Sequence, residues 1–414
     1  MSAAALNARL AAEHPAAARC LSPLGARLYF PRGIPVQAKE AAACAYNATI
    51  GQLRGPDGHA APLDALRRLV PALDADQSFL YAPQGGLPNL RDRWAARLAE
   101  RASPGSAPLS RPFVTSGITH GLSLLADLFV GPGTEVLLPS PCWDNYAQVF
   151  GTRSGGILRS YSALSPEGFS VEGFAAAVGA LRGPAVVVLN FPSNPGGYAP
   201  SAAEADQLVA VLTAHPGPLV VLCDDAYQGM VWDAERPPHS VMHRLAAVAD
   251  PERLLVVSTD GATKELFYFG GRVGFVTAVL PGGGGAALEE KLTAAIRVSV
   301  SSVSGTAQAI VLAALDDPAL LAQREALHAD LAARWARLRD GLEAAGVPAW
   351  PFNAAFFALL PAPTDAEELR HAFLKDGLGL VSAAAGPNLR LSYASLQLDD
   401  IDPVVEILAK RLAR

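Results

Sequence analysis

Two residues that follow one predicted strand could carry out chemistry together. Lys264 comes shortly after an apolar run at residues 254–257, and Arg272 lies eight residues further on, behind a pair of glycines. A lysine amine can condense with an aldehyde when its surroundings lower its pKa enough to leave free amine. An arginine on the same wall can hold a phosphate dianion through two parallel hydrogen bonds. Together the two residues predict a site for a phosphorylated aldehyde.

Pyridoxal 5'-phosphate (PLP) carries both groups, and a further residue suits its ring. Asp224 ends the apolar run at residues 219–223, where a carboxylate is costly unless a cation pairs with it. A protonated pyridine nitrogen is such a cation, and this pairing would keep the ring an electron sink. Asp225 should point to the other side of the strand, toward a structural partner.

Three other strand ends carry groups suited to the same cofactor, each with an ordinary structural alternative. Residues 116–119 precede an apolar helix and could bind an anion at its start, or could simply cap it. Trp143 could stack on a pyridine ring or be a partly buried core residue. Asn194, between two prolines, could donate to a phenolate oxygen or belong to an ordinary turn. Because these groups follow in order, each at an apolar strand end, the combined site is favoured.

An α/β sheet would bring these groups together. Apolar runs predict strands at residues 112–116, 135–139, 185–190, 219–224, 254–258 and 272–278. Continuous hydrophobicity is typical of strands that are buried on both faces of a mostly parallel sheet. Open sheets of this kind bind ligands beyond the carboxyl ends of their strands. We therefore predict an α/β fold with a mostly parallel, doubly wound sheet in a large PLP-binding domain, residues 51–305.

The chain after residue 305 follows a different pattern. Leucines at 327, 331, 338 and 342, with Trp335 among them, predict a long amphipathic helix that Gly346 and Pro348 end. Strand-like runs at 354–360 and 388–393 and a closing helix from about residue 402 come next. We predict a smaller α+β domain formed by residues 1–50 and 306–414.

Composition excludes several classes of protein. The 414 residues are 50% hydrophobic and 17% charged, and a net charge of −6 argues against a nucleic-acid partner. The four cysteines, at 20, 44, 142 and 223, form no C-x-x-C pair, which favours reduced thiols over disulfides or a metal site. No uncharged apolar run reaches the ~18 residues of a membrane span, and the charged N-terminus is unlike a signal peptide. We expect a cytoplasmic protein.

The motifs together resemble the class I/II family of PLP-dependent aminotransferases, in the fold of aspartate aminotransferase, over residues 29–395. The resemblance implies that Lys264 forms a Schiff base with the cofactor and shuttles the proton at the substrate α-carbon. Asp224 would bind the ring nitrogen, while Tyr227 and Asn194 would hold the ring oxygen. The remaining implied contacts are ring stacking by Trp143 and phosphate binding by Arg272 with the turn Gly117, Ile118 and Thr119; Trp143 and Asn194 would also face the substrate.

Other implied roles concern the substrate and a second subunit. Arg390 would grip the substrate α-carboxylate in a bidentate pair, and Gly51 would lie in the loop over that carboxylate. Tyr81 would reach the phosphate of the neighbouring subunit, which implies a homodimer with shared sites. Gly261 departs from the family, which has serine or threonine at this place as a phosphate ligand. Either Thr263 substitutes or the phosphate has one contact fewer.

The implied activity is ping-pong transfer of an amino group from an L-amino acid to a 2-oxo acid through an aldimine. Arg297 occupies a place similar to the family's distal-carboxylate arginine, which points to 2-oxoglutarate/glutamate or aspartate as one substrate. A solvated arginine is the alternative, because charged residues 289–291 precede it. The alternative activity is a PLP-dependent lyase or an oxidising, decarboxylating enzyme, which would share Lys264, Asp224 and Arg390.

Overall fold

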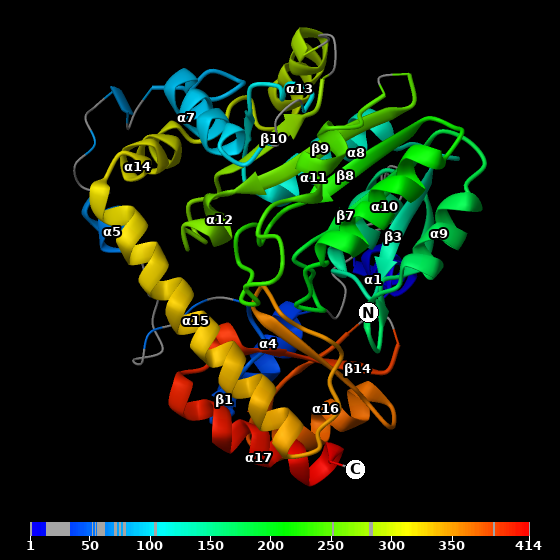
Figure 1. Cartoon of the computed structure of the whole chain (residues 1–414), viewed down its shortest axis with the longest axis vertical. Coiled ribbons are helices and arrows are strands. Elements are labelled where there is room, and N and C mark those ends of the chain that lie inside the picture. The colour runs from blue at the N-terminus through cyan, green and yellow to red at the C-terminus, as the bar shows by residue number, and fades with distance from the viewer. Residues whose placement is uncertain are drawn as a thin grey trace.

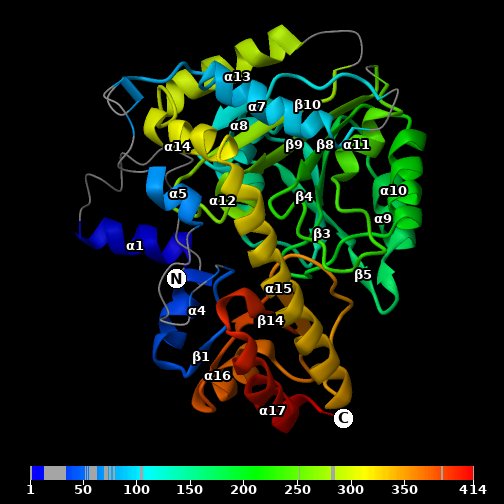
Figure 2. The same ribbon diagram turned by 60° about the vertical axis from the view of Figure 1, so that its left-hand side comes forward.

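The computed structural model describes residues 2–13, 34–51, 53, 55, 63–69, 73, 76–77, 80–102, 106–250, 252–280, 285–383 and 386–413. Within these residues the chain forms a larger part around one wide sheet and a smaller part at the other end of the molecule (Figure 1). The long helix α15 (Pro318–Ala344) runs from α14 (Gly305–Leu315) in the larger part to the smaller part, as Figure 2 also shows.

The sheet of the larger part has seven strands in the order β2-β10-β9-β8-β7-β3-β4. In that order the strands are Phe113–Thr115, Gly274–Ala278, Leu254–Gly261, Leu219–Asp224, Ala185–Asn190, Glu135–Ser140 and Ile157–Ser162. β10 is antiparallel to both of its neighbours, whereas the pairs from β9 to β4 are parallel. The predicted mostly parallel sheet is confirmed. The sequence interpretation missed β4, which lies at the sheet edge with an exposed, polar pattern.

Helices cover both faces of this sheet, as the doubly wound prediction requires. Along β7, Val186 and Val188 join the core beneath α8 (Ile118–Phe129), while Val187 and Leu189 join the core beneath α9 (Val171–Gly179) and α10 (Ala202–Ala214). The predicted capping box at the start of α10 is present, since Ser201 and Glu204 bond each other's backbone amides. α7 (Pro88–Ala99), α11 (Val241–Ala246) and α13 (Gly285–Ser299) complete these layers.

The smaller part joins the two ends of the chain. The strand order is β11-β14-β13, made of Phe357–Pro361, Asn388–Ser392 and Val381–Ser382. β1 (Tyr46–Asn47) pairs in parallel with β12 (Leu378–Gly379), so residues 46 and 47 lie against the C-terminal elements. The other elements here are α4 (Ile34–Glu40), η1 (Ala41–Ala43), α16 (Ala366–Lys375), η4 (Tyr393–Ser395), η5 (Leu398–Asp400) and α17 (Ile401–Leu412).

The domain boundaries drawn from the sequence stay predictions. Ile310 and Val311 of α14, with Leu320 and Leu331 of α15, pack in the core of the larger part. Leu338 and Leu342 of α15 pack with the smaller part. The remaining elements are α1 (Ala3–Glu13), α5 (Asp64–Leu69), η3 (Ala147–Arg153), β5 (Leu164–Ser165), β6 (Gly168–Phe169) and α12 (Ala262–Glu265).

Two further sequence expectations concern cysteines and membranes. Cys44, Cys142 and Cys223 are free thiols, and Cys20 lies outside the described residues. Among the helices that the structure describes, none combines the length and the apolar character needed to cross a bilayer.

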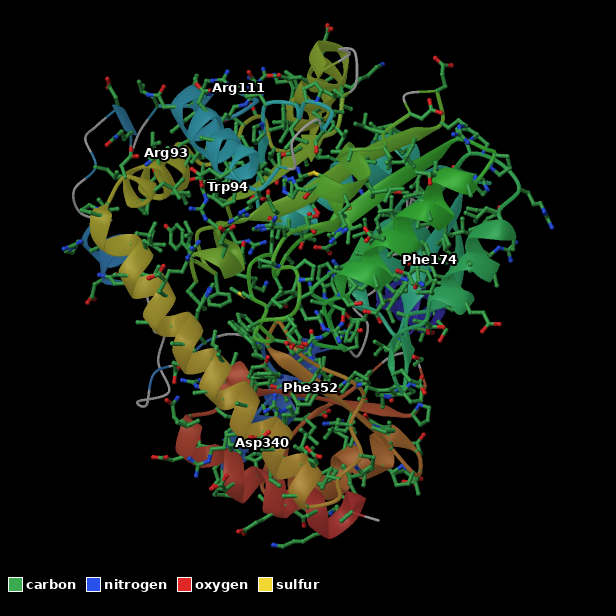
Figure 3. All side chains as sticks on the ribbon, in the orientation of Figure 1. Arg93, Trp94, Arg111, Phe174, Asp340 and Phe352 are labelled. Atoms are coloured by element: carbon green, nitrogen blue, oxygen red, sulfur yellow. The ribbon has the colours of Figure 1, made fainter. Side chains whose placement is uncertain are left out.

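Polar contacts tie α7 to the sheet beside the strand that leads to Lys264. The Trp94 indole N–H donates to Asp260 Oδ2 at 2.9 Å, and its ring stacks on Phe275 with 4.1 Å between centroids. Figure 3 labels Trp94 on α7. Both partner residues belong to strands, so α7 is fixed directly to β9 and β10.

Candidate active site

A cleft of about 230 Å³ opens at the carboxyl ends of the sheet strands, next to the smaller part. It brings together most of the residues predicted from sequence: Gly51, Ile118, Thr119, Trp143, Asn194, Asp224, Tyr227, Lys264, Arg272 and Arg390. The sequence interpretation had not named Tyr146, Asn190, Ala226 and Phe357 as lining residues. The α/β topology explains this convergence, because neighbouring parallel strands end at one edge.

Lys264 lies on the short turn α12, directly after β9. Its Nζ is 5.4 Å from the ring centroid of Tyr227 and 5.9 Å from that of Phe269. Burial lowers the pKa of the amine to about 8; Asp224 opposes this shift, while Arg272 and Arg390 add to it. A larger fraction of the amine is therefore unprotonated near neutral pH than for an ordinary lysine, as attack on a carbonyl requires.

Asp224, at the end of β8, is 3% exposed and held by two donors. The Tyr146 hydroxyl donates to its Oδ2 at 2.5 Å, and the Ala226 backbone N–H donates to its Oδ1 at 3.3 Å. Burial raises the pKa of Asp224 to about 6, although these hydrogen bonds and nearby Lys264 act to lower it. Burial also raises the pKa of Tyr146, so this tyrosine stays protonated and donates. A cationic ring nitrogen against Asp224 would stabilise its charged form.

The role of Tyr146 was missed, although the sequence held a signal for it. Tyr146 follows Trp143 by three residues, and the two rings meet edge to face at 5.6 Å. A tyrosine one helical turn after a candidate stacking residue points to the same side. The spacing indicates the side to which Tyr146 points, but not that its hydroxyl reaches Asp224 at the end of β8, two strands away in the sheet.

Arg390, on β14, is buried and anchored at both ends of its guanidinium. Nη1 donates to Asn194 Oδ1 at 2.9 Å, Nη2 donates to the Thr49 carbonyl at 2.5 Å, and Nε has no partner in the described part of the chain. The guanidinium carbon lies 4.4 Å from the ring centroid of Phe357. A Cβ on Gly51 would come within 2.5 Å of that ring, so this loop needs glycine to pass over the arginine. Burial lowers the pKa of Arg390 to about 10.

The turn before α8 forms the candidate phosphate site. Gly117 has a φ of +76°, and a Cβ there would lie 2.4 Å from Arg272 Nη2. The backbone therefore approaches the guanidinium as closely as only glycine permits. Ile118 and Thr119 begin α8, where amide groups have no intrahelical acceptor. Two amides at a helix start and an arginine that lines the same cleft suit a phosphate dianion.

The position of Gly261 excludes the family's usual hydroxyl ligand. A Cβ there would lie 2.6 Å from the Val273 carbonyl oxygen and 2.7 Å from the Gly274 Cα. Thr263, two residues on, lines the cleft, and its buried Oγ1 has no hydrogen-bond partner within the described residues. An orphaned hydroxyl in the cleft wall is what a missing phosphate ligand would leave. The donor set present thus fits a phosphorylated pyridine aldehyde.

Tyr227 forms part of the cleft wall beside two phenylalanines. Its ring packs edge to face against Phe356 and Phe357, at 5.3 and 5.6 Å. Burial raises its pKa, so the phenol is a hydrogen-bond donor.

Asp225, one residue after Asp224, accepts from Ser258 Oγ at 2.5 Å, and so has the structural partner that the sequence predicted.

Two predicted site residues lie away from the cleft of their own chain. The Tyr81 residue is 91% exposed. Arg297, near the end of α13, donates from Nη1 to Ser301 Oγ at 2.6 Å on the surface, beside Val298, which is 86% exposed. The roles given to Tyr81 and Arg297 both stay predictions.

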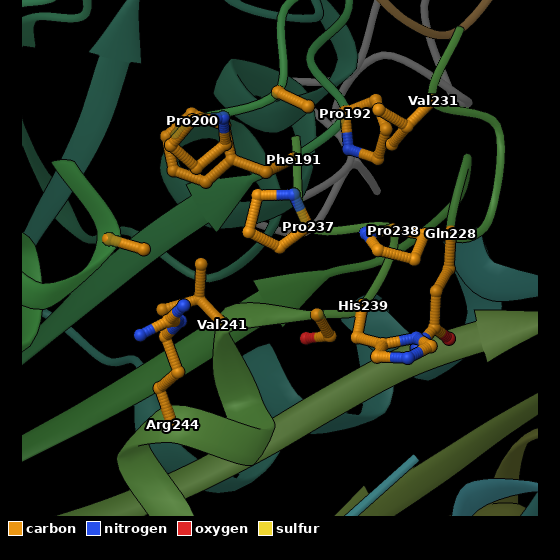
Figure 4. A pocket seen from close by; sticks show the side chains of 13 residues that line it. Phe191, Pro192, Pro200, Gln228, Val231, Pro237, Pro238, His239, Val241 and Arg244 are labelled. Carbon is orange, nitrogen blue, oxygen red and sulfur yellow. The ribbon is translucent and has the colours of Figure 1, made fainter. Parts of the chain in front are cut away.

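A second, much smaller cavity of about 20 Å³ shares no lining residue with the cleft. Figure 4 shows Pro237, Pro238, His239 and Gln228 along it. The Gln228 amide is buried and lacks a hydrogen-bond partner in the described part of the chain. The space suits one water molecule and is too small for an amino acid.

The fold and the cleft define an enzyme whose lysine is poised to react with a carbonyl group. Comparison with known proteins gives the family: the model for aminotransferase class I and II matches residues 46–408, and this chain belongs to that family. An aspartate/prephenate aminotransferase of Thermus thermophilus is 28% identical over 346 residues, 81% of this chain and 83% of the relative. An aspartate aminotransferase of Bacillus subtilis is 23% identical over 79% of this chain and 82% of its own length.

Solved structures show the same fold. An aminotransferase from Anaerococcus prevotii superposes with a TM-score of 0.81 at 18% identity, covering 93% of this chain and 97% of the other. A kynurenine aminotransferase from Pyrococcus horikoshii, solved in complex with PMP, gives a TM-score of 0.79 at 17% identity over 96% and 97%. The predicted aminotransferase fold and enzyme class are thereby confirmed.

Proposed function

We propose that this chain binds PLP through Lys264 and transfers an amino group between an L-amino acid and a 2-oxo acid. The proposal is carried by one observation: a lysine with a pKa of about 8 shares a cleft with the buried pair Asp224–Tyr146 and with Arg390. Membership of a PLP-dependent family supports the same assignment.

The cofactor would be held by groups from separate strand ends. Asp224 would pair with the ring nitrogen, and Tyr227 and Asn194 would bond the ring oxygen. Arg272, the amides of Ile118 and Thr119, and Thr263 would hold the phosphate. When bound, PLP supplies an aldehyde that bonds amines and a ring that accepts electrons from the substrate α-carbon.

The substrate would be oriented by Arg390 and acted on by Lys264. The Arg390 guanidinium can clamp a carboxylate through two hydrogen bonds, which fixes the α-carbon relative to the cleft wall. Lys264, once its amine is free, would remove the proton from that α-carbon and return it to the carbon two bonds away, on the cofactor side of the amino nitrogen. Trp143 and the Gly51 loop would exclude water from the reacting atoms.

A direct test is covalent capture. The protein is purified with PLP, reduced with borohydride, digested and mapped by mass spectrometry, with Lys264→Ala as control. A pyridoxyl label on the peptide that holds Lys264, absent from the variant, is the expected result. Labelling elsewhere, or equal labelling of the variant, would refute the proposal.

We further propose glutamate with 2-oxoglutarate, or aspartate, as one substrate pair, and a homodimer with shared sites. The names of the relatives from Thermus thermophilus and Bacillus subtilis support the first point. The exposure of Tyr81 and Arg297, each free to meet a second copy, is consistent with the second. A lyase would release ammonia and a keto acid instead, and the family match does not favour it.

Arg297→Ala tests both points together. We expect KM for dicarboxylic amino acids to rise about tenfold or more, the loss of one charged hydrogen bond, with little change for alanine. Sedimentation equilibrium of the same variant would report whether the dimer persists. A uniform change in KM for all substrates would discard the dicarboxylate role, and a monomeric wild type would discard the shared site.

A further inference from the structure

A histidine holds the turn before α8 in its anion-binding shape. The backbone N–H of Ser116 donates to Nδ1 of His120 at 3.1 Å, across the turn. Gly117, the residue at the helix cap, makes no side-chain cap hydrogen bond. His120, the third helical residue, instead resembles the third residue of a capping box, whose side chain reaches back to accept a backbone N–H at the start of the helix.

The bond between Ser116 and His120 limits which backbone amides of the turn remain available to bind a ligand. The Gly117 N–H donates to the Thr115 carbonyl at 2.8 Å, and the His120 N–H donates to the Gly117 carbonyl at 3.1 Å. Thr115 Oγ1 also donates to the Gly117 carbonyl, at 3.0 Å. With the Ser116 amide bonded to the imidazole, the Ile118 and Thr119 amides are those left to face the cleft. His120 is not among the residues that line the cleft, so its contact acts on the turn and not on a ligand.

The contact requires a neutral imidazole. Because Nδ1 accepts the Ser116 amide, the proton lies on Nε2, which is 3.5 Å from Ser299 Oγ of α13. Burial lowers the pKa of His120, and Arg153 of η3 adds to this while Asp127 of α8 opposes it. Among the other packed elements, α13 carries Arg297 near its end, β9 carries Asp260, and β10 is the uncharged segment Gly274–Ala278.

We propose that His120 is a positioning residue whose neutral ring maintains the phosphate-binding turn. The inference rests on the proposed function in one respect, that an anion binds at this turn. Protonation of His120 would replace the acceptor lone pair with a second N–H, which would turn the Ser116 amide away and deform the turn.

The test uses inorganic phosphate and cofactor-free protein, with binding measured by calorimetry near pH 8. In His120→Asn the side-chain oxygen takes the place of Nδ1, and we expect a dissociation constant within about twofold of wild type. In His120→Leu the acceptor is lost, and we expect binding about tenfold weaker, the usual effect of one lost hydrogen bond. His215→Leu is the matched control, because His215 Nδ1 likewise accepts a backbone N–H, from Gly217 at 3.1 Å, outside the cleft.

The pH dependence of phosphate affinity distinguishes a positioning role of His120 from a role in stability alone. Phosphate affinity is compared between pH 8 and pH 5 for each protein. We expect the affinity of wild type to fall by a factor at least about three times larger than that of His120→Asn, because asparagine does not titrate in this range. His120→Leu should follow the shallower profile of the asparagine variant. Equal affinity of wild type and His120→Leu near pH 8, or a wild type that binds more tightly than His120→Asn near pH 5, would overturn the proposal.

Failure of this inference is distinguishable from failure of the proposed function. If borohydride labels Lys264 in wild type but His120→Leu binds phosphate normally, His120 has no positioning role and the aminotransferase proposal stands. If wild type binds neither phosphate nor PLP, both proposals fall. Fluorescence-monitored unfolding of each variant identifies any that have lost the fold, and His120→Asn then still tests the pH profile.

Discussion

Glu265 offers the sharpest test of how the reactive turn is held in place. It directly follows Lys264 in α12, yet its side chain points away from the cleft and is only 5% exposed. Three arginines surround it: Arg97, whose Nη2 donates to Oε1 in a very short contact, Arg101 at 2.9 Å and Arg324 at 3.4 Å. These come from α7, from the residues just after it, and from α15, so one carboxylate joins three segments.

We predict that Glu265→Gln destabilises the protein by about 3 kcal/mol. Removing one partner of a buried ion pair costs about 3–5 kcal/mol, because the charge left behind stays buried and unpaired. The lower end applies here for two reasons. The three arginine side chains are 16–22% exposed, so water screens them in part. Glu265 also raises the pKa of nearby Asp260, so its loss would let Asp260 ionise more readily and compensate.

The assay is urea unfolding of cofactor-free wild type and variant, followed by tryptophan fluorescence. Asp402→Asn is the control. It breaks the ion pair between Asp402 and Arg337, whose side chains are 55% and 41% exposed, and we expect it to destabilise the protein far less than Glu265→Gln does. Equal losses in the two variants would refute the claim that burial makes the Glu265 cluster strong.

The same cluster gives a pH dependence with a definite sign. The arginines hold the pKa of Glu265 below its ordinary value. A lowered folded-state pKa means that the stabilisation is fully present above the unfolded pKa of about 4.3 and is lost as pH falls through the folded value. The difference between wild type and Glu265→Gln should therefore be constant from neutral pH to about 4.3 and shrink below it. A difference that grows on acidification would contradict the assignment.

Three other predictions concern the cleft. Arg390→Lys should raise KM for every amino acid by about tenfold or more while leaving PLP labelling intact, since lysine cannot form the bidentate pair; an unchanged KM would remove Arg390 from the substrate site. Tyr146→Phe should raise the pKa of buried Asp224 and weaken PLP binding about tenfold, measured by equilibrium dialysis, and unchanged affinity would contradict this. Acylation of Lys264 in cofactor-free protein should rise with a midpoint near its pKa of about 8, and a midpoint near 10.4 would show no desolvation.

Much of the fold was predictable because the sheet strands are strongly patterned. β7 and β8 were placed with their observed bounds, since an unbroken apolar run between turn residues has few other interpretations. β4 (Ile157–Ser162) was missed because five of its six positions are exposed at the edge of the sheet, and only its first two residues form an apolar run in the sequence. Strand length at the end of β9 was also underestimated, because Asp260 and Gly261 look like turn residues until Trp94 and β10 pair with them.

Site residues were predictable where one strand end supplied them and not where two distant segments met. Lys264, Asp224 and Asn194 follow apolar runs directly, so topology alone assembles them. The bond of Tyr146 to Asp224 joins segments 78 residues apart in the sequence, whereas that of Ser116 to His120 crosses a single turn. Both bonds depend on where a side chain reaches, which no periodicity encodes. The sequence also left open whether Thr263 takes the place of the usual hydroxyl ligand. Only the close backbone contacts at Gly261 show that position 261 has no room for a side chain, which leaves Thr263 as the candidate ligand.

Burial and neighbouring charges act in opposite ways on the consecutive residues Lys264 and Glu265 of α12, and this explains why the ion pairs of Glu265 are needed to hold α12 in place. Burial disfavours the charged form of Lys264, so the turn would lower its free energy by swinging the amine out to water. Glu265 opposes that motion, because the same swing would pull its carboxylate from three guanidinium groups. We therefore expect the ion pairs of Glu265 to keep the Lys264 amine in the cleft. If so, Glu265→Gln should shift the midpoint of Lys264 acylation upward toward that of an ordinary lysine, whereas Asp402→Asn should leave it unchanged; identical midpoints in both variants would show that the amine is held by the cleft alone.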